Sequence, residues 1–195
     1  MSELVAYIQS NPLEVTGTLV GLVYLWLEYK ANIWLWVAGI IMPAIYIFVY
    51  YRAGLYADFG INVYYLIAAV YGLVMWKGST AEKKELPITF TPKRVYLPLV
   101  IVSVAALLLI AWILIRFTDS NVPWWDSFTT ALSIVGMWML AKKYIEQWFT
   151  WIAVDAVSCG LYIYKELYFT SVLYGLYAMI AILGYFKWKR LMQEE

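Results

Sequence analysis

Residues 95–115 read VYLPLVIVSVAALLLIAWILI and carry no charged side chain between Arg94 and Arg116. A helix needs about 20 apolar residues to cross the hydrocarbon core of a bilayer. This run has the required length, and nothing in it must be kept in water. It therefore predicts a membrane-spanning helix.

Six further apolar runs flank this segment. They enclose one ionisable side chain, Asp155. Two of the runs, 15–27 and 127–141, are short, and they cross a bilayer only if Glu14 and Asp126 lie within the span or at its edge. The pattern predicts an all-α integral membrane protein with seven transmembrane helices. The six runs cover residues 15–27, 31–51, 59–76, 127–141, 147–164 and 167–186.

The composition agrees with a membrane environment. Of the 195 residues, 64% are hydrophobic and 14% are charged, and the mean hydropathy is +0.71. Soluble domains carry about 25% charged residues, and a net charge of +1 gives no basic surface for nucleic acid. Histidine is absent and Cys159 is the single cysteine. We therefore expect no catalytic site, no metal site and no cofactor.

The basic residues predict the orientation of the chain, because basic connections remain in the cytoplasm. The connection KGSTAEKKELPITFTPKR (77–94) contains five of them. With seven alternating helices, this side collects all of the 14 basic residues except Arg52, Arg116 and Lys165. We expect the N-terminus outside and the C-terminus in the cytoplasm. The first residues, MSELVAYIQSNPLEV, lack a basic segment, so no removable signal peptide is expected.

The chain also resembles itself at an offset of 112 residues. A shift of three residues, to an offset of 115, aligns Trp36 with Trp151 and Asn32 with Gln147. Ordered matches at a nearly constant offset indicate an internal repeat. The matches at 112 are Glu14 with Asp126, Thr18 with Thr130, Leu55 and Tyr56 with Leu167 and Tyr168, Tyr65 with Tyr177, Gly72 with Gly184, and Trp76 and Lys77 with Trp188 and Lys189.

The repeat predicts how the single membrane domain, residues 1–195, is organised. Residues 13–77 form a first three-helix repeat, 95–116 a connecting helix, and 125–189 a second three-helix repeat. An odd number of helices between the halves gives them the same orientation. Parallel repeats of this kind are typical of transporters, which hold their substrate near the membrane midplane between the halves.

Asp155 is the residue that most directly indicates a function. A carboxylate in the middle of a membrane helix costs roughly 2.5–3.5 kcal/mol, and such residues are functional candidates by default. Trp148, Trp151 and Asp155 have the spacing i, i+3, i+7, which predicts one shared helix face. Two indoles beside a carboxylate would bind a flat, positively charged ring. Two alternatives remain: the tryptophans form an interfacial belt, or Asp155 pairs with Lys165 or carries a proton.

Two further groups could complete such a site. Asn62 and Tyr65 lie three residues apart on the third helix, and Tyr174 and Tyr177 occupy the matching positions on the seventh. Their amide and hydroxyl groups would hydrogen-bond a polar ligand. Since the chain has 18 tyrosines, packing is an alternative for each of them. An amide such as Asn62 needs a partner in lipid.

The segment PWWDS (123–127) opens the fifth helix. Trp125 and Asp126 could form a gate there, but Asp126 near a helix N-terminus could equally act as a cap. Pro43 lies inside the second helix, where we expect it to introduce a kink.

Four segments of the chain resemble the PnuC family of bacterial vitamin transporters. They are EVTGTLVGLVYLWLEYKANIWLW (14–36), LYADFGINVYYLIAAVYGLVMW (55–76), PWWDS (123–127) and KKYIEQWFTWIAVDAVSCGLYIYKELYFTSVLYG (142–175). The resemblance implies a bacterial cytoplasmic-membrane protein with seven helices in a 3+1+3 arrangement related to the SWEET sugar transporters, assembled as a homotrimer.

The resemblance also implies a substrate site. The family's motif positions, tryptophans and an asparagine on the sixth helix and a glutamine on the third, fall on Trp148, Trp151, Asp155 and Asn62. This chain departs from the nicotinamide riboside transporters by carrying Asp155 for asparagine and Asn62 for glutamine. Thiamine and nicotinamide riboside are both fixed cations; we favour thiamine slightly and place the neutral riboflavin third.

The expected activity is facilitated uptake of the vitamin by alternating access. The resemblance implies that phosphorylation of the vitamin in the cytoplasm draws this uptake inward. A proton-coupled symporter that uses Asp155 is the alternative.

Overall fold

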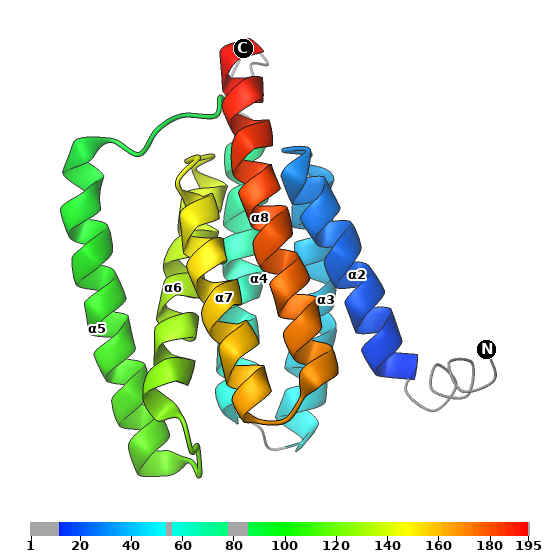
Figure 1. Cartoon of the computed structure of the whole chain (residues 1–195), viewed down its shortest axis with the longest axis vertical. Helices are drawn as coiled ribbons and strands as arrows, with labels where there is room; N and C mark the ends of the chain where they lie inside the picture. Colours follow the sequence, from blue (N-terminus) through cyan, green and yellow to red (C-terminus); the bar gives the residue numbers. More distant parts are fainter. Residues whose placement is uncertain (1–11, 54–55, 78–85, 195) are drawn as a thin grey trace.

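The computed structural model describes residues 12–53, 56–77 and 86–194. This part of the chain contains seven α-helices and one isolated parallel β-bridge, between Thr89 and Tyr144 (Figure 1). The helices are α2 (Pro12–Tyr29), α3 (Trp34–Ala53), α4 (Tyr56–Trp76), α5 (Lys93–Phe117), α6 (Pro123–Ala141), α7 (Gln147–Tyr164) and α8 (Tyr168–Glu194).

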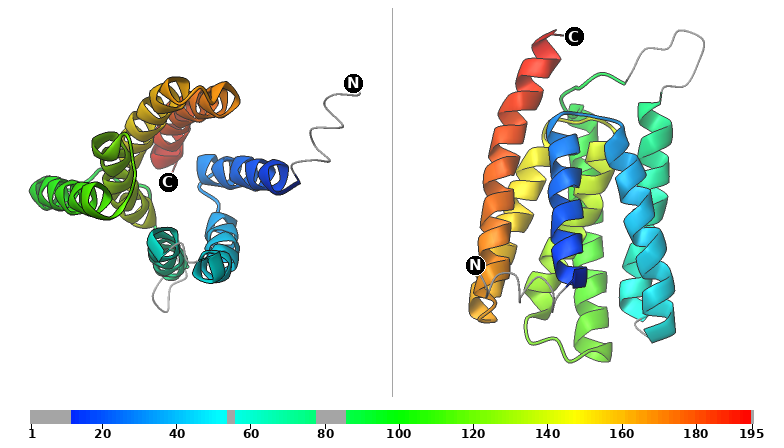
Figure 2. Two further views of the ribbon diagram at one scale, coloured as in Figure 1. Left: turned by 90° about the horizontal axis from the view of Figure 1, so that it is seen from below. Right: turned by 90° about the vertical axis from the view of Figure 1, so that its right-hand side faces the viewer.

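Six of the helices close into a ring. Going around it, α2 packs against α3, α3 against α4, α4 against α6, α6 against α7, α7 against α8, and α8 against α2. Helix α5 stands outside the ring and packs against α6, as the left-hand view of Figure 2 shows. The prediction of an all-α fold with seven helices is confirmed for the described residues.

The outer surface of the bundle is apolar. Helix α5 buries only Ala111 and exposes the apolar side chains along most of its length. The stretches Phe59–Trp76, Lys93–Phe117 and Thr170–Glu194 are long and apolar enough to cross a bilayer, while Val20–Tyr29 and Trp34–Phe48 are shorter apolar helices. Helices suit this surface because each satisfies its backbone hydrogen bonds internally, as lipid requires.

The two ends of the bundle differ in charge. We call the end that carries the turns 30–33 and 142–146 and the C-terminus of α8 the basic end, and the opposite end the far end. The basic end is at the top of Figure 1. Lysines 30, 142, 143, 187 and 189 and Arg190 all belong to the basic end.

Four indole rings pack in a row at the basic end, and we call them the indole chain. Trp36 meets Trp76 edge to face, with ring centroids 5.5 Å apart, and Trp148 meets Trp188 in the same way at 5.6 Å. Trp76 and Trp188 join the two pairs at 6.2 Å. Edge-to-face contacts at these distances are favourable because the positive edge of one ring faces the negative face of the next. All four rings are buried in the hydrophobic core.

The two pairs have matching surroundings. The ring of Trp36 lies against Gly72, and that of Trp148 lies against Gly184, so closely that a Cβ at either glycine would collide with it. The residue whose contacts match those of Trp36 is therefore Trp148, 112 positions later. The alignment of Trp36 with Trp151 at an offset of 115 is wrong, because the contacts keep the offset of 112 through this segment.

The C-terminal carbonyl groups of two helices receive hydrogen bonds from these indoles. Trp76 Nε1 donates to the carbonyl oxygen of Leu140 in α6 at 3.2 Å, and Trp188 Nε1 donates to that of Glu28 in α2 at 2.9 Å. The last carbonyls of a helix lack a partner within the helix. Each of these carbonyls also accepts a backbone hydrogen bond from the turn after its helix, Leu140 from Lys143 N and Glu28 from Ala31 N, both at 2.9 Å. Each indole is therefore a second donor to a carbonyl near the end of a helix far away in the sequence.

The segment before α5 is fastened to the start of α7. Thr89 exchanges backbone hydrogen bonds with Lys143 and Ile145. Glu146 accepts hydrogen bonds from the backbone N and the Oγ1 of Thr91 at 2.9 and 2.8 Å, and one from the hydroxyl of Tyr96 at 3.2 Å. We call this set of contacts the linker clamp.

Candidate functional site

A cavity of about 420 Å³ lies in the middle of the six-helix ring. This volume is within the range of small-molecule sites. The described lining comes from all six helices of the ring and includes nothing from α5. The lining residues are Val20, Gly21, Tyr24, Leu25, Glu28, Ala38, Gly39, Met42, Pro43, Tyr65, Ser133, Met137, Trp151, Val154, Asp155, Tyr174 and Tyr177.

Five of the residues predicted to bind substrate line this cavity. Trp151 and Asp155 come from α7, Tyr65 from α4, and Tyr174 and Tyr177 from α8. They lie far apart in the sequence, and the ring brings them together. These five residues bring to the cavity an indole, three phenols and a carboxylate, the groups that we expected for a cationic aromatic ligand.

Asp155 is largely buried, with 7% of its surface exposed. Its expected alternative partner, Lys165, instead pairs with Asp126, at 3.8 Å between Nζ and Oδ1. The interpretation of Asp155 as the partner of Lys165 is therefore wrong.

The ring of Tyr174 packs against the rings of two other tyrosines. It stacks on Tyr162 of α7, with centroids 5.1 Å apart, and meets Tyr177 edge to face at 5.7 Å. Across the cavity, the Tyr177 hydroxyl lies against Gly21 of α2, where an added Cβ would be 3.1 Å away. The two tyrosines thus form an aromatic wall on the α8 side of the cavity.

Trp148 and Asn62 are placed elsewhere. Trp148 is fully buried, belongs to the indole chain, and is absent from the described lining of the cavity. Its neighbour on the helix, Trp151, packs near Gly136 and reaches the cavity. Asn62 is half-buried on α4, also outside that lining. The structure therefore does not bring both indoles to Asp155.

Pro43 lies inside α3, which continues without a break from Trp34 to Ala53. Proline removes one backbone hydrogen bond from a helix interior. Pro43 is buried and lines the central cavity, so this weak point in the helix faces the candidate site.

Glu28 is a cavity residue that the sequence analysis missed. It is 1% exposed and lines the cavity from α2. Gln147, at the start of α7, is fully buried beside it. Glu28 directly follows the predicted apolar run 15–27, but α2 continues to Tyr29 and so includes it. The signal that could have found the pair is the spacing of Gln147, Trp151 and Asp155, which at i, i+4, i+8 share one helix face.

A smaller cavity of about 160 Å³ leads from the central cavity toward the far end. The two share Tyr65, Ser133, Val154 and Tyr174 in their linings, and hydroxyl groups of Thr129, Thr130 and Ser158 line the smaller one. Polar side chains thus connect the centre of the ring with the far end.

Asp126 and Lys165 line that smaller cavity toward the far end and pair with each other. Asp126 also accepts a hydrogen bond from Ser120 Oγ at 2.9 Å. The N-cap of α6 is Val122, which makes no side-chain capping bond, so the alternative of Asp126 as the N-cap is wrong. Asp126 lies in the first turn of α6, where its charge suits the helix dipole.

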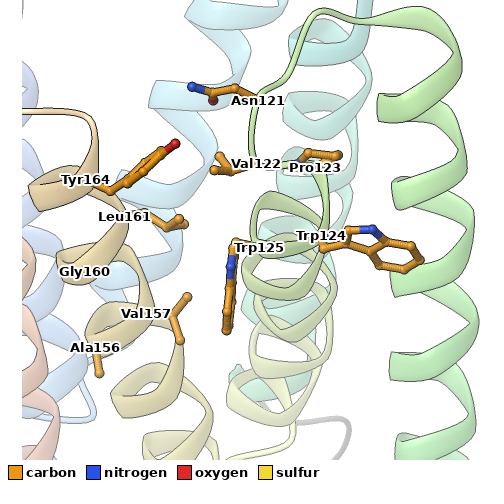
Figure 3. A pocket seen from close by; sticks show the side chains of 10 residues that line it. All are labelled: Asn121, Val122, Pro123, Trp124, Trp125, Ala156, Val157, Gly160, Leu161 and Tyr164. Carbon is orange, nitrogen blue, oxygen red and sulfur yellow. The ribbon is translucent and has the colours of Figure 1, made fainter.

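Trp125 faces a different space. Figure 3 shows its ring between α6 and α7, while Trp124 points toward α5. The apolar groove there, of about 620 Å³, is lined by Trp125, Val157, Leu161 and Tyr164 among others. Of the two residues predicted as a gate, only Asp126 lies on the polar route to the centre.

Among the described residues, no group of three or more Cys, Asp or Glu side chains is placed to hold a metal ion. The residues that line the central cavity offer aromatic contact, hydrogen bonding and negative charge.

Comparison with known proteins identifies relatives of the whole chain. The chain is 25% identical over 201 residues to the nicotinamide riboside transporter PnuC of Escherichia coli (strain K12), covering 90% of this chain and 84% of the relative. It is 27% identical to the protein of the same name from Neisseria mucosa, covering 84% of this chain and 66% of that relative. It is 22% identical to the riboflavin/roseoflavin transporter RibM of Streptomyces davaonensis, covering 90% of this chain and 83% of that relative.

The fold and a family model agree with these relatives. The crystal structure of the vitamin B3 transporter PnuC superimposes with a TM-score of 0.71 at 24% identity, covering 97% of this chain and 87% of that one. The family model of the nicotinamide mononucleotide transporters matches residues 11–190. The chain therefore belongs to this family, as a multi-pass membrane transporter of the PnuC type.

Proposed function

We propose that this protein carries a cationic, ring-containing vitamin, thiamine or nicotinamide riboside, into the cell by facilitated diffusion. The observation that supports this most directly is that Trp151 and Asp155 line one central cavity. An indole face attracts a cation, and more strongly where water is excluded. Asp155 supplies the counter-charge of a cation that cannot lose its charge.

The nature of the cation narrows the substrate. The thiazolium of thiamine and the pyridinium of nicotinamide riboside both carry a fixed positive charge beside an aromatic ring. Riboflavin is neutral and leaves Asp155 unmatched, although a relative is named as a riboflavin/roseoflavin transporter. A buried carboxylate without a matching charge is unfavourable, so we place riboflavin third.

We further propose that α2–α4 and α6–α8 are parallel repeats joined by α5, the 3+1+3 arrangement of SWEET-like transporters. The domain boundaries are those predicted, 13–77, 95–116 and 125–189. The matching pairs Trp36–Trp76 and Trp148–Trp188 support this, as do the turn residues Ala31 and Lys143, 112 positions apart, with φ of 50° and 52°.

Alternating access would follow from rocking of these halves around the cavity. In this proposal the indole chain is the barrier at the basic end, and the Asp126–Lys165 pair is the gate on the polar route at the far end; the ring contacts and the ion pair support these roles. By the positive-inside rule the basic end faces the cytoplasm, with the N-terminus outside. We propose a homotrimer in the bacterial cytoplasmic membrane, by analogy with the family.

Binding calorimetry tests the proposal. Purified protein is titrated with thiamine, nicotinamide riboside and riboflavin, and the series is repeated on Asp155→Asn, which keeps the shape and removes the charge. We expect one of the two cationic vitamins to bind the parent protein, and the substitution to weaken that binding about tenfold or more. If none of the three vitamins binds, the proposed function is wrong.

A proton-coupled symporter that uses Asp155 is the competing mechanism. Uptake into proteoliposomes, measured with and without a proton gradient, separates the two. Facilitated diffusion predicts the same initial rate in both conditions, whereas dependence of the initial rate on the gradient would establish coupling.

A further inference from the structure

We propose that Glu28 is a second ligand-binding carboxyl group of the central cavity, and that it binds the aminopyrimidine ring of a thiamine-like substrate while Asp155 balances the thiazolium. This inference rests on the proposed function and narrows its substrate to one class: a cation that carries a second, basic nitrogen heterocycle.

The carboxyl group of Glu28 lies in the wall of the cavity beside the side chain of Gln147. Its Oε1 makes no hydrogen bond of standard geometry with the described residues. The two amide atoms of Gln147, next to it, are also without a hydrogen bond of standard geometry. Buried polar groups are nearly always paired, and an unpaired one is costly. A ligand in the cavity would give Glu28 a partner.

The contacts of Glu28 with its neighbours do not require a carboxyl group at this position. Trp188 donates its hydrogen bond to the main-chain oxygen of Glu28, which any residue at this position would offer. Membrane helices carry ionisable side chains almost exclusively where they serve a pathway, a partner or a ligand. The carboxyl group is therefore available for the cavity.

The two acids line the same cavity, Glu28 from α2 and Asp155 from α7, and their charges interact. Gln147, beside Glu28, and Asp155 are eight residues apart on α7, about 12 Å along the helix axis. Trp151 lies between them on the same helix face and also lines the cavity. A ligand with one polar end at Asp155 and another at Glu28 would therefore lie along the indole of Trp151.

The aminopyrimidine ring of thiamine suits the Glu28 end of the cavity. A carboxyl group hydrogen-bonds a basic ring nitrogen, either as the acid with a neutral ring or as the carboxylate with a protonated ring. It also accepts a hydrogen bond from an amino group. The aminopyrimidine of thiamine offers both a basic ring nitrogen and an amino group. The carboxamide of nicotinamide riboside can hydrogen-bond a carboxyl group, but it has no basic nitrogen to take up the proton of Glu28.

Gln147 acts as a positioning residue in this proposal. It contacts Glu28 and is not in the described lining of the cavity. Its amide can donate to one carboxyl oxygen and leave the other for the ligand. Replacing it should weaken thiamine binding less than replacing Glu28 does.

The experiment compares two ligands on three proteins by calorimetry. The ligands are thiamine and its thiazolium half alone, N-methylated 5-(2-hydroxyethyl)-4-methylthiazolium. The proteins are the parent, Glu28→Gln, and the control Glu166→Gln, whose carboxylate is exposed at the far end. We expect Glu28→Gln to weaken thiamine binding about tenfold or more and to leave the thiazolium half within about twofold. Glu166→Gln should change neither.

Three results would overturn the inference. One is that Glu28→Gln weakens both ligands equally, which indicates a structural role. Another is that it weakens neither. A third is that the parent binds nicotinamide riboside but not thiamine, which leaves the proposed function standing and removes Glu28 from it. Failure of every vitamin to bind the parent, by contrast, is the failure of the proposed function.

A change in the ligand avoids any dependence on the folding of the variant. The parent protein is titrated with a thiamine analogue in which both pyrimidine ring nitrogens are replaced by C–H. We expect this analogue to bind about tenfold or more weakly than thiamine. Equal affinity for the two would show that nothing in the cavity binds the ring nitrogens.

Discussion

Trp188 donates its indole N–H to the main-chain carbonyl oxygen of Glu28 at 2.9 Å, across 160 residues of sequence. The same relationship joins Trp76 to Leu140. In both cases the third helix of one three-helix group, α4 or α8, donates a hydrogen bond to a carbonyl near the end of the first helix of the other group, α6 or α2. The basic end is thus held together by two reciprocal contacts, and each can be tested separately.

Replacing either indole by a phenyl ring should destabilise the protein to a similar degree. Trp76→Phe and Trp188→Phe keep an aromatic ring and remove the N–H, so in each case a carbonyl loses one of its two hydrogen-bond donors, at a cost of about 0.5–1.5 kcal/mol. Thermal unfolding in detergent measures the effect, with the exposed Trp112→Phe on α5 as a control. A lower unfolding temperature for only one of the two would contradict the reciprocity.

The two glycines under the indoles should tolerate no side chain. Gly72→Ala and Gly184→Ala place a methyl group inside the rings of Trp36 and Trp148, and overpacking of this kind costs about 1–3 kcal/mol. Gly60→Ala and Gly160→Ala are matched controls, because no atom outside their own helix lies within 4 Å of an added Cβ there. Alanine should stabilise those helices slightly. The unfolding temperature should therefore fall for Gly72→Ala and Gly184→Ala and rise slightly for Gly60→Ala and Gly160→Ala.

Trp151 and Trp148 should differ in what they contribute. Trp151→Ala removes an aromatic face from the cavity and should weaken vitamin binding about tenfold or more. Trp148→Ala empties a buried space in the indole chain and should lower the free energy of unfolding by about 3–5 kcal/mol. Calorimetry and thermal unfolding are measured on both variants. If Trp148→Ala remains stable and loses binding, the residue contacts substrate as its motif position implies.

The Asp126–Lys165 pair should affect transport more than stability. Both side chains are partly exposed, and such pairs contribute little to the free energy of unfolding. If the pair acts as a gate, Asp126→Asn should raise the initial rate of vitamin uptake into proteoliposomes without changing the dissociation constant. Asp119→Asn, an exposed neighbour in sequence, serves as the control. An unchanged rate for Asp126→Asn would remove it from the gating mechanism.

The linker clamp should be visible by hydrogen exchange. Glu146→Ala removes the acceptor of the Thr91 amide and hydroxyl groups, so the backbone amides of Thr91 and Thr89 should exchange faster than in the parent. Glu194→Ala, exposed near the end of α8, should leave them unchanged. Continued protection after Glu146→Ala would show that the Thr89 backbone contacts suffice.

The sequence predicted the helices well for a physical reason. Lipid leaves no alternative partner for backbone groups, so each long apolar run must be helical, and residues 95–115 could be assigned from composition alone. Asp155 was also predictable, because a charge inside such a run is costly and therefore rare.

Other parts of the site could not be predicted from the sequence. Trp148 and Trp151 lie almost on the same helix face, and which of them reaches the cavity depends on the space above Gly184, a feature of α8. Glu28 ends an apolar run, where a charge usually marks the membrane boundary. Only the packing of α2 against its neighbours turns that carboxyl group inward.

The indole chain has a further consequence for how this transporter can be observed. Trp76 and Trp188 stand 112 positions apart in sequence, yet their rings meet at 6.2 Å, with another indole in contact on either side. Chromophores this close couple their electronic transitions, and the coupling falls steeply as they separate. If the basic end opens between the two halves, Trp76 must part from Trp188. The near-ultraviolet circular dichroism of the unlabelled protein is therefore a built-in reporter of opening at that end.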